Sequence, residues 1–393
     1  MKKILIPTED GFYRSVLSIC RSLGSQGHQI HILSSSNRFK LFQKVLKSKY
    51  CFHYDSCSNP MIKPHSFIEE LKAYTVNNNI DIILPVIDSS ASLLAYYKKS
   101  LAAKVPLPDY KYFKKAIDKY QMVKIAQKVN VPTPKTYEFE GLENFRKLIN
   151  RKQISYPFVL KPKIRGDHLE HIKIINNKKE LVKYSDKFEK IGKLEPLYNY
   201  QRPLLQEFLK GTIYDCCTLS KNGKLLVALS QYRLRTLNSF GGAGAVNITS
   251  KTPLIIKYSK ILLRELNFTG PAQIEWLKTE ENKFYLMEVN PRFWGTTQLS
   301  IDAGINFPLL TINLLQDKSL NLENLTYKTG IKKRWVFPEE FLSLLRDKTN
   351  RLHRLKEYLN IMEFKAPYIK SNINIDDFKP FLYNLFFYPL QFL

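Results

Sequence analysis

Two glutamates and an asparagine in the last third of the chain have the chemistry of a divalent-metal site. Glu275 lies in one apolar run, and Glu288 and Asn290 lie in the next, with residues 279–282 as a polar segment between the runs. Two such runs around a polar turn predict a hairpin, in which alternation puts Glu288 and Asn290 on one face. A loop of even length would put Glu275 on that face as well, whereas an odd length would not. Carboxylate and amide oxygens suit Mg²⁺, with Mn²⁺ as an alternative.

The same segment ends at Arg292, whose planar guanidinium could bridge a transferring phosphoryl group. Two apolar residues, Phe284 and Leu286, share the face of the glutamates. They count against the metal site, although they lie farther from the end of the strand. The alternative interpretation of the segment is a salt-bridged hairpin with a solvated acidic face. The local sequence leaves both interpretations open.

Lysines at two positions could bind phosphate. Lys161 ends an apolar run, Phe-Val-Leu-Lys, and a buried lysine needs a charged partner. The alternative is a lysine that simply emerges at the end of a strand. Lys119 lies in a helical segment, where an exposed lysine is the ordinary interpretation.

Residues 206–209, Gln-Glu-Phe-Leu, predict a strand that ends in a loop, because Gly211 follows soon after. The backbone of Phe208 and Leu209 could contact a nucleotide base there, while Glu207 accepts a hydrogen bond from an amine. Taken by itself this pattern is weak.

Arg233 and Arg235 are expected on one face of a strand, ahead of glycines at positions 241, 242 and 244. Glycines allow the backbone to approach an anion closely, so this stretch could contact phosphate. The alternative is a flexible hairpin tip, which is the better interpretation of the stretch when it is taken alone.

The beginning of the chain predicts a parallel α/β domain. An apolar strand at 4–6 precedes a helical pattern at 16–23, and a second strand follows at 29–33. Strand, helix and strand in this order form a βαβ unit. A helix at 67–76 and a strand at 81–86 predict another such unit, which favours a parallel sheet.

The 393 residues carry a net charge of +26 and are enough for two or three domains. A positive field suits ATP, nucleic acid or an anionic membrane, although a lysine-rich solvated surface explains the charge equally well. The lysines are spread along the chain, and no zinc-finger, helix-turn-helix or RNA-recognition signature appears. We therefore expect no nucleic-acid partner.

Five scattered cysteines without a CxxC spacing predict a protein of the reducing cytoplasm. The first apolar run is too short for a secretory signal, and no run is long enough to span a bilayer. The apolar C-terminus, residues 378–393, could lie at the inner membrane face as a peripheral contact. Packing of this tail against the body of the protein is the preferred alternative, and the sequence does not give the oligomeric state.

Six motifs follow one another along the chain: Asp118-Lys119, Val131-Pro-Thr-Pro134, Phe158-Val-Leu-Lys161-Pro162, Gln206-Glu207-Phe-Leu-x-Gly211, Glu275 and Glu288-Val-Asn290-Pro-Arg292. This order resembles the ATP-grasp superfamily, and within it the carboxylate–amine ligases that are similar to carbamoyl-phosphate synthetase. The resemblance covers about residues 1–318 and is strongest at 118–310.

The resemblance implies an α/β and α+β fold. An N-terminal parallel α/β domain, the pre-ATP-grasp domain, would precede a two-lobed ATP-grasp fold and a helical C-terminal extension. The boundaries that we predict are 1–108 for the N-terminal domain, 109–190 for the small lobe, 191–318 for the large lobe and 319–393 for the extension.

The resemblance also implies a role for each candidate residue. The implied ATP-binding residues are Lys119 and Lys161 at the phosphates, Glu207, Phe208 and Leu209 at the adenine, and Asp215 at the ribose. The implied Mg²⁺ ligands are Glu275, Glu288 and Asn290. The implied catalytic residues are Arg292 at the acyl-phosphate and Arg235 at an anion near the γ-phosphate or the substrate.

The chain departs from the superfamily pattern at two places. Where members usually have an acidic residue, position 213 is isoleucine, which puts the ribose contact of Asp215 in question. The loop after the strand lysine keeps a single glycine, Gly166, so Arg165 or His168 would have to take over phosphate contacts. The alternative is a degenerate site.

The implied activity is phosphorylation of a small carboxylate by ATP, followed by attack of an amine on the acyl-phosphate, with release of ADP and phosphate. A lid at residues 150–190 would keep water from the intermediate. Two alternatives remain: phosphorylation of a small acid such as carbamate without amide formation, and a degenerate ATP-binding protein at a membrane surface. The sequence names neither substrate.

Overall fold

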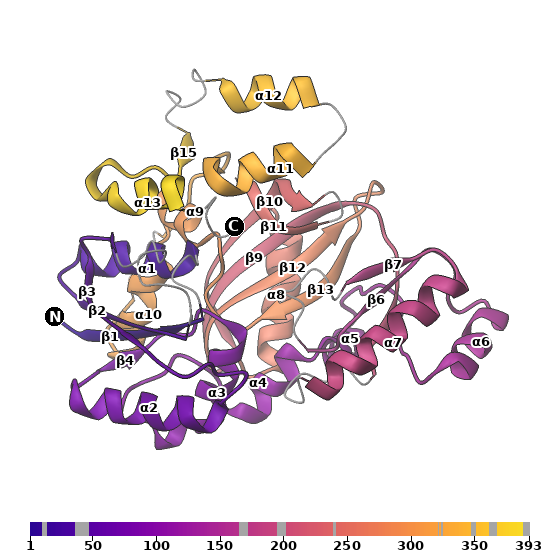
Figure 1. The fold of residues 1–393 in the computed structure, drawn as a ribbon, viewed down its shortest axis with the longest axis horizontal. Helices are drawn as coiled ribbons and strands as arrows, with labels where there is room; N and C mark the ends of the chain where they lie inside the picture. Colours follow the sequence, from indigo (N-terminus) through magenta and orange to yellow (C-terminus); the bar gives the residue numbers. More distant parts are fainter. Residues whose placement is uncertain are drawn as a thin grey trace.

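The computed structural model describes residues 1–9, 14–35, 47–164, 172–194, 202–238, 241–320, 322–323, 325–346, 351–360 and 368–387. In these ranges the chain forms three sheets with helices packed between and around them (Figure 1). No described helix is both long enough and apolar enough to cross a membrane.

The N-terminal domain is a parallel sheet in the order β3-β2-β1-β4. Its elements are β1 (Lys3–Thr8), α1 (Arg14–Gly24), β2 (Gln29–Ser34), β3 (Cys51–Ser56), α2 (Pro64–Asn77), β4 (Ile82–Ile83) and α3 (Asp88–Tyr97). Ile4 and Ile6 pack with α1, whereas Leu5 packs with α2 and α3, because successive side chains of β1 point to opposite faces. The predicted parallel α/β domain is confirmed, although the strand expected at 81–86 is only two residues long.

Helices α4 (Tyr110–Ile117) and α5 (Lys119–Lys128) lead to a small antiparallel sheet in the order β5-β8-β6-β7. The elements of this small lobe are β5 (Thr136–Glu138), α6 (Leu142–Asn150), β6 (Phe158–Lys161), β7 (Lys173–Ile175), α7 (Lys178–Leu194) and β8 (Leu204–Glu207). Strand β8 lies beyond residue 190, so the small lobe extends past the boundary predicted from the sequence.

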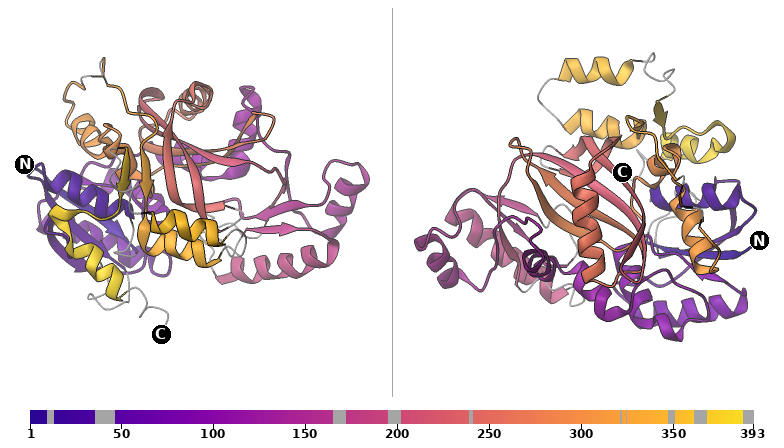
Figure 2. Two further views of the ribbon diagram at one scale, coloured as in Figure 1. Left: turned by 90° about the horizontal axis from the view of Figure 1, so that it is seen from above. Right: turned by 180° about the vertical axis from the view of Figure 1, so that it is seen from behind.

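The large sheet has the order β13-β12-β9-β10-β11-β14-β15. Its long strands are β9 (Thr212–Lys221), β10 (Lys224–Asn238), β11 (Gly241–Ser250), β12 (Gly270–Lys278) and β13 (Phe284–Asn290). Asn222 and Gly223 join β9 to β10 with φ angles of 50° and 76°, as a two-residue hairpin turn requires. Helix α8 (Pro253–Glu265) lies across the back of this sheet (Figure 2) and buries apolar residues against it.

The end of the chain is largely helical, as predicted, and also adds two strands to the large sheet. Its elements, with the two helices before it, are α9 (Thr297–Asp302), α10 (Phe307–Leu315), β14 (Lys332–Arg334), α11 (Phe341–Arg346), α12 (Arg351–Leu359), β15 (Ile369–Ser371) and α13 (Lys379–Phe387). Strand β14 pairs with β11 and then with β15. Strands of three residues are too short for an alternating pattern to reveal them in a sequence.

Candidate active site

Glu275 and Glu288 lie directly opposite each other on β12 and β13, which confirms the predicted hairpin. The loop between the strands, residues 279–283, has an odd length, which alone would pair Glu275 with Met287. The register shifts by one residue next to Glu275, so Met287 is an extra residue on β13 and the two glutamates come into register. Nδ2 of Asn290 lies 3.0 Å from Glu275 Oε1 and 3.4 Å from Glu288 Oε1, so the three side chains meet.

Two lysines bring positive charge to these glutamates from separate elements. Lys119 is the first residue of α5, which Asp118 caps by accepting hydrogen bonds from two backbone N–H groups. The Nζ atom of Lys119 lies 3.0 Å from Glu288 Oε2. Lys161 ends β6 in the small sheet and is 5% exposed. Burial lowers the pKa of Lys161 to about 8, with the charge of Lys119 adding to the effect and the glutamates opposing it.

Arg233 lies on the other side of the glutamates. Its Nη2 is 2.7 Å from Asp215 Oδ1 and 2.8 Å from Glu275 Oε1. Burial alone would lower the pKa of Arg233, but these carboxylates raise it, so the guanidinium stays charged. In the sequence, Arg233 and Gln231 alternate on one strand and so share a face. This pattern predicts a contact with Asp215 only when the pairing of β9 with β10 is known.

Asp215, Glu275 and Glu288 form a row across β9, β12 and β13, and we call these three residues the acidic row. Burial raises the pKa of Glu275, and the other two carboxylates raise it further against the opposing charge of Arg233. Burial acts in the same direction on Glu288, but the two lysines outweigh it and lower the pKa of Glu288. The acidic row therefore has a firmly ionised carboxylate at its lysine end.

The fold matches known proteins along most of its length. The family model described as "ATP-grasp in the biosynthetic pathway with Ter operon" matches residues 199–336. The chain thus shares the ATP-grasp fold. Among solved structures, the biotin carboxylase domain of 2-oxoglutarate carboxylase from Hydrogenobacter thermophilus, with MgADP and bicarbonate, is 15% identical, with a TM-score of 0.68 over 84% of this chain and 73% of that one.

Two further ATP-grasp structures are similar in the same way. An L-amino acid ligase from Bacillus licheniformis is 19% identical, with a TM-score of 0.60 over 80% of this chain and 74% of that one. The N5-carboxyaminoimidazole synthetase from Staphylococcus aureus, complexed with ADP, is 14% identical, with a TM-score of 0.60 over 81% of this chain and 78% of that one. At these identities the likeness concerns the ATP-grasp fold.

The N-terminal domain binds the arginine of the last ATP-grasp motif. Nε and Nη2 of Arg292 lie 2.6 and 2.9 Å from the two carboxylate oxygens of Asp88, the first residue of α3. Nη2 is also 3.5 Å from Asn290 Oδ1. Arg292 thus lies beside the acidic row and forms a bidentate ion pair with Asp88. Its catalytic role stays a prediction.

Arg235 points to the C-terminal extension. A bulge at Leu234 interrupts the pairing of β10 with β11 between Arg233 and Arg235. The guanidinium of Arg235 forms ion pairs with Glu340 and Glu357. Within the described residues, Arg233 is therefore the arginine beside the acidic row, and the anion contact of Arg235 stays a prediction.

Glu207, Phe208 and Leu209 lie between the small and the large sheet. The backbone N–H of Glu207, at the end of β8, donates to the carbonyl of Lys135, and Glu207 Oε2 accepts from the Lys135 N–H at 3.2 Å. Phe208 and Leu209 are half-buried in the segment that leads to β9. A segment between the two lobes suits a base, and the adenine contact stays a prediction.

Two other site predictions stay open. The fully buried carboxylate of Asp215 accepts hydrogen bonds from Arg233 and Gln231, and its ribose contact stays a prediction. The phosphate-loop residues Arg165 and His168 lie outside the described residues, as does part of the expected lid.

Proposed function

We propose that the chain is an ATP- and Mg²⁺-dependent carboxylate–amine ligase that acts through an acyl-phosphate and releases ADP and phosphate. The observation that carries the proposal is the meeting of Glu275, Glu288 and Asn290 with Lys119 and Lys161, which come from two different sheets and a helix. Relatives of the same fold are described with ADP or MgADP, and one as an amino acid ligase.

The donor set fits Mg²⁺, with Mn²⁺ as the alternative, in the presence of a nucleotide. The described residues contain no group of three or more His, Cys, Asp or Glu side chains suited to a metal. The protein would supply the oxygens of Glu275 and Glu288 and, once its amide turns from the glutamates, Oδ1 of Asn290, and nucleotide phosphates would complete the shell, as is usual for Mg²⁺. A bound ion would offset charge on the phosphates and polarise them.

The chain's own residues would position the reactants. Lys119 and Lys161 would bind phosphate oxygens, with Arg233 as a further cation. Residues 207–209 would contact the adenine. Arg292, held by Asp88, would face the phosphorylated carboxylate, and the amine would then attack its carbonyl carbon and displace phosphate.

An ADP-release assay tests the proposal. Purified protein, ATP and Mg²⁺ are combined with amino acids and sugar acids, each with and without amines, and with a chelator as the control. We expect ADP release only with a carboxylate and a divalent ion, and an amide product when an amine is present. Acyl-phosphate trapped by hydroxylamine with no amide for any amine would favour the carbamate-type kinase, and ATP binding without any turnover would favour the degenerate site.

Membrane contact by the C-terminal tail stays a separate proposal. Leu385 and Phe386 on helix α13 are exposed, as is Phe378 just before it, and the chain is strongly basic. Flotation with anionic liposomes, with and without residues 378–393, decides the point. Equal flotation of the two proteins would reject the tail as the contact.

A further inference from the structure

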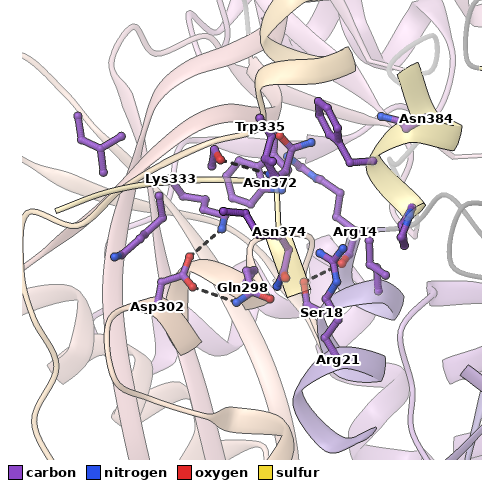
Figure 3. Close-up of a pocket in the computed structure, with 18 residues that line it drawn as sticks. Arg14, Ser18, Arg21, Gln298, Asp302, Lys333, Trp335, Asn372, Asn374 and Asn384 are labelled. Carbon is purple, nitrogen blue, oxygen red and sulfur yellow. Dashed lines mark hydrogen bonds and ion pairs between the residues drawn. The ribbon is translucent and has the colours of Figure 1, made fainter. Parts of the chain in front are cut away.

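A pocket of about 470 Å³ lies where α1 of the N-terminal domain meets α9, β14, β15 and α13 (Figure 3). Strands β14 and β15 end the strand order of the large sheet opposite to β12 and β13. Four strand spacings separate β14 from β12, which corresponds to roughly 20 Å along the sheet. The pocket is therefore separate from the acidic row, and its volume is that of a small-molecule site.

Positive charge is concentrated in this pocket. Arg14, Arg21, Lys333 and Lys370 line it, and Asp302 is the one carboxylate among its lining residues in the described chain. Lys333 is 4% exposed and its Nζ lies 2.8 Å from Asp302 Oδ2. Burial lowers the pKa of Lys333 against the effect of Asp302, and the charges of Arg21 and Lys370 lower it further. An anion in the pocket would relieve this repulsion.

Carboxylates outside the lining neutralise part of this charge. Arg21 pairs with Asp377 at 2.8 Å, and Nε of Arg14 lies 3.7 Å from Glu339. Asp302 also accepts a hydrogen bond from Gln298 at 3.0 Å. The exposed Lys370, together with Lys333, whose charge is shared with Asp302, would face an incoming anion.

One wall of the pocket holds a buried acceptor without a partner. Asn384 of α13 is 1% exposed, and its Nδ2 donates to the carbonyl of Phe337 at 3.0 Å. Because a carbonyl can only accept, this contact fixes the orientation of the amide. Oδ1 of Asn384 has no hydrogen-bond partner among the described residues. Buried acceptors are normally satisfied, so this one calls for an N–H or O–H donor from a ligand.

The other walls combine neutral polar side chains, among them Ser18, Asn372 and Asn374, with an apolar surface. Leu17, Trp335, Ile369 and Phe381 line the pocket between its polar ends, and the guanidinium of Arg14 stacks 4.3 Å from the centre of the Trp335 ring. Apolar walls with a few placed polar groups are typical of sites for small organic molecules.

We propose that this pocket is a second binding site, for a small organic acid that carries an N–H or O–H donor beside an apolar body. The carboxylate would lie at Lys333 and Lys370, and the donor would bind Oδ1 of Asn384. An apolar amino acid and an apolar 2-hydroxy acid both have this chemistry. The site goes beyond the proposed ligase activity and does not depend on it.

Calorimetric titration of the full-length protein without nucleotide tests the site. The probes are apolar L-amino acids and the matching 2-hydroxy acids, each beside its primary amide, which lacks the negative charge. We expect one or more free acids to bind, with the corresponding amide weaker by about tenfold. Binding should survive in the Glu288→Gln variant, which places it outside the acidic row.

Two variants locate the bound acid. Lys370→Glu reverses an exposed charge at the pocket and should weaken binding about tenfold, and Lys328→Glu, an exposed lysine outside the lining, should leave it unchanged. Asn384→Leu removes the acceptor and should weaken binding about fivefold. If Asn384→Leu does not fold, Lys370→Glu still decides, because its side chain is exposed.

The inference is overturned if no free acid binds at millimolar concentration, or if acids and amides bind equally. It is also overturned if Lys370→Glu and Lys328→Glu behave alike, or if Glu288→Gln abolishes binding. None of these outcomes depends on turnover, so they leave the ligase proposal to its own assay. Conversely, a failed ligase assay leaves the binding results intact.

Discussion

Most of the charged groups that the candidate site brings together act on Glu288. Lys119 contacts it at 3.0 Å, Lys161 adds a second positive charge, and Glu275 faces it across the hairpin. The lysines stabilise the ionised form of Glu288 although its surroundings disfavour charge, so its pKa is lowered. Its carboxylate is therefore ionised more readily than that of an ordinary glutamate.

Replacing Glu288 by Gln should abolish most Mg²⁺-dependent ADP release. The substitution keeps the shape of the side chain but removes an anionic ligand and the partner of Lys119. We expect a loss on the order of 100-fold in the rate of ADP release. Glu280→Gln, in the exposed loop of the same hairpin, is the matched control and should keep the wild-type rate. Similar rates for the two variants would remove Glu288 from the site.

Nucleotide affinity should fall as pH rises through about 8. The pKa of Lys161 is lowered to about 8, so the side chain is charged below that pH and loses its proton above it, well before an ordinary lysine would. Dissociation constants of a non-hydrolysable ATP analogue, measured from pH 7 to 9.5, should therefore rise. Lys161→Arg keeps its charge throughout and should flatten the profile. A flat wild-type profile, or an equal slope in the variant, contradicts the role of Lys161.

At the scale of the element, close backbone contacts fix how strands sit against their neighbours. The bulge at Met287 decides which residue of β13 faces Glu275, although the loop length favours another register. Gly270, the first residue of β12, has a φ of 111° and lies against the segment before α4, where an added Cβ would be 1.9 Å from the carbonyl oxygen of Pro106. The close contact at this glycine packs the large sheet against the end of the N-terminal domain.

Gly270→Ala should destabilise the protein more than Gly141→Ala does. Gly141 has a similar φ of 103° but nothing within 4 Å of an added Cβ, so its substitution isolates the backbone strain, about 1–3 kcal/mol. Gly270→Ala adds a clash with backbone, and we expect a total of about 3 kcal/mol or more. Thermal unfolding midpoints measure the difference. Equal midpoints would show that the backbone around Pro106 shifts to accommodate the added Cβ without a loss of stability.

At the scale of the whole molecule, a buried ion network ties the C-terminal extension to the large sheet. Arg334 is fully buried, and its Nε lies 2.9 Å from Glu340 Oε2. The same carboxylate pairs with Arg235 of β10. Removing one member of a buried pair leaves an uncompensated charge, which costs more than the pair contributes.

Glu340→Ala should loosen the extension by leaving both arginines without this carboxylate. We expect a loss of about 3 kcal/mol in the free energy of unfolding and faster hydrogen exchange in residues 336–346. Glu323→Ala removes an exposed carboxylate and should change neither quantity. Unchanged exchange in Glu340→Ala would show that apolar packing alone holds the extension.

The sequence determined the parts of this protein that depend on short-range patterns. Alternation predicted the hairpin that carries Glu275 and Glu288, and apolar periodicity predicted the parallel N-terminal domain. Motif order along the chain indicated the ATP-grasp superfamily. These features are readable because they depend on neighbours within a few tens of residues.

Only the tertiary structure decided which distant side chains meet. Loop length could not give the register of the hairpin, because a one-residue bulge reverses the parity. The choice of Arg233 over Arg235 depends on a bulge in β10, and the partner of Arg292 comes from Asp88, 204 residues away. The pocket behind β14 unites four separate stretches of the chain. Such contacts follow from packing, which joins residues without regard to their separation in sequence.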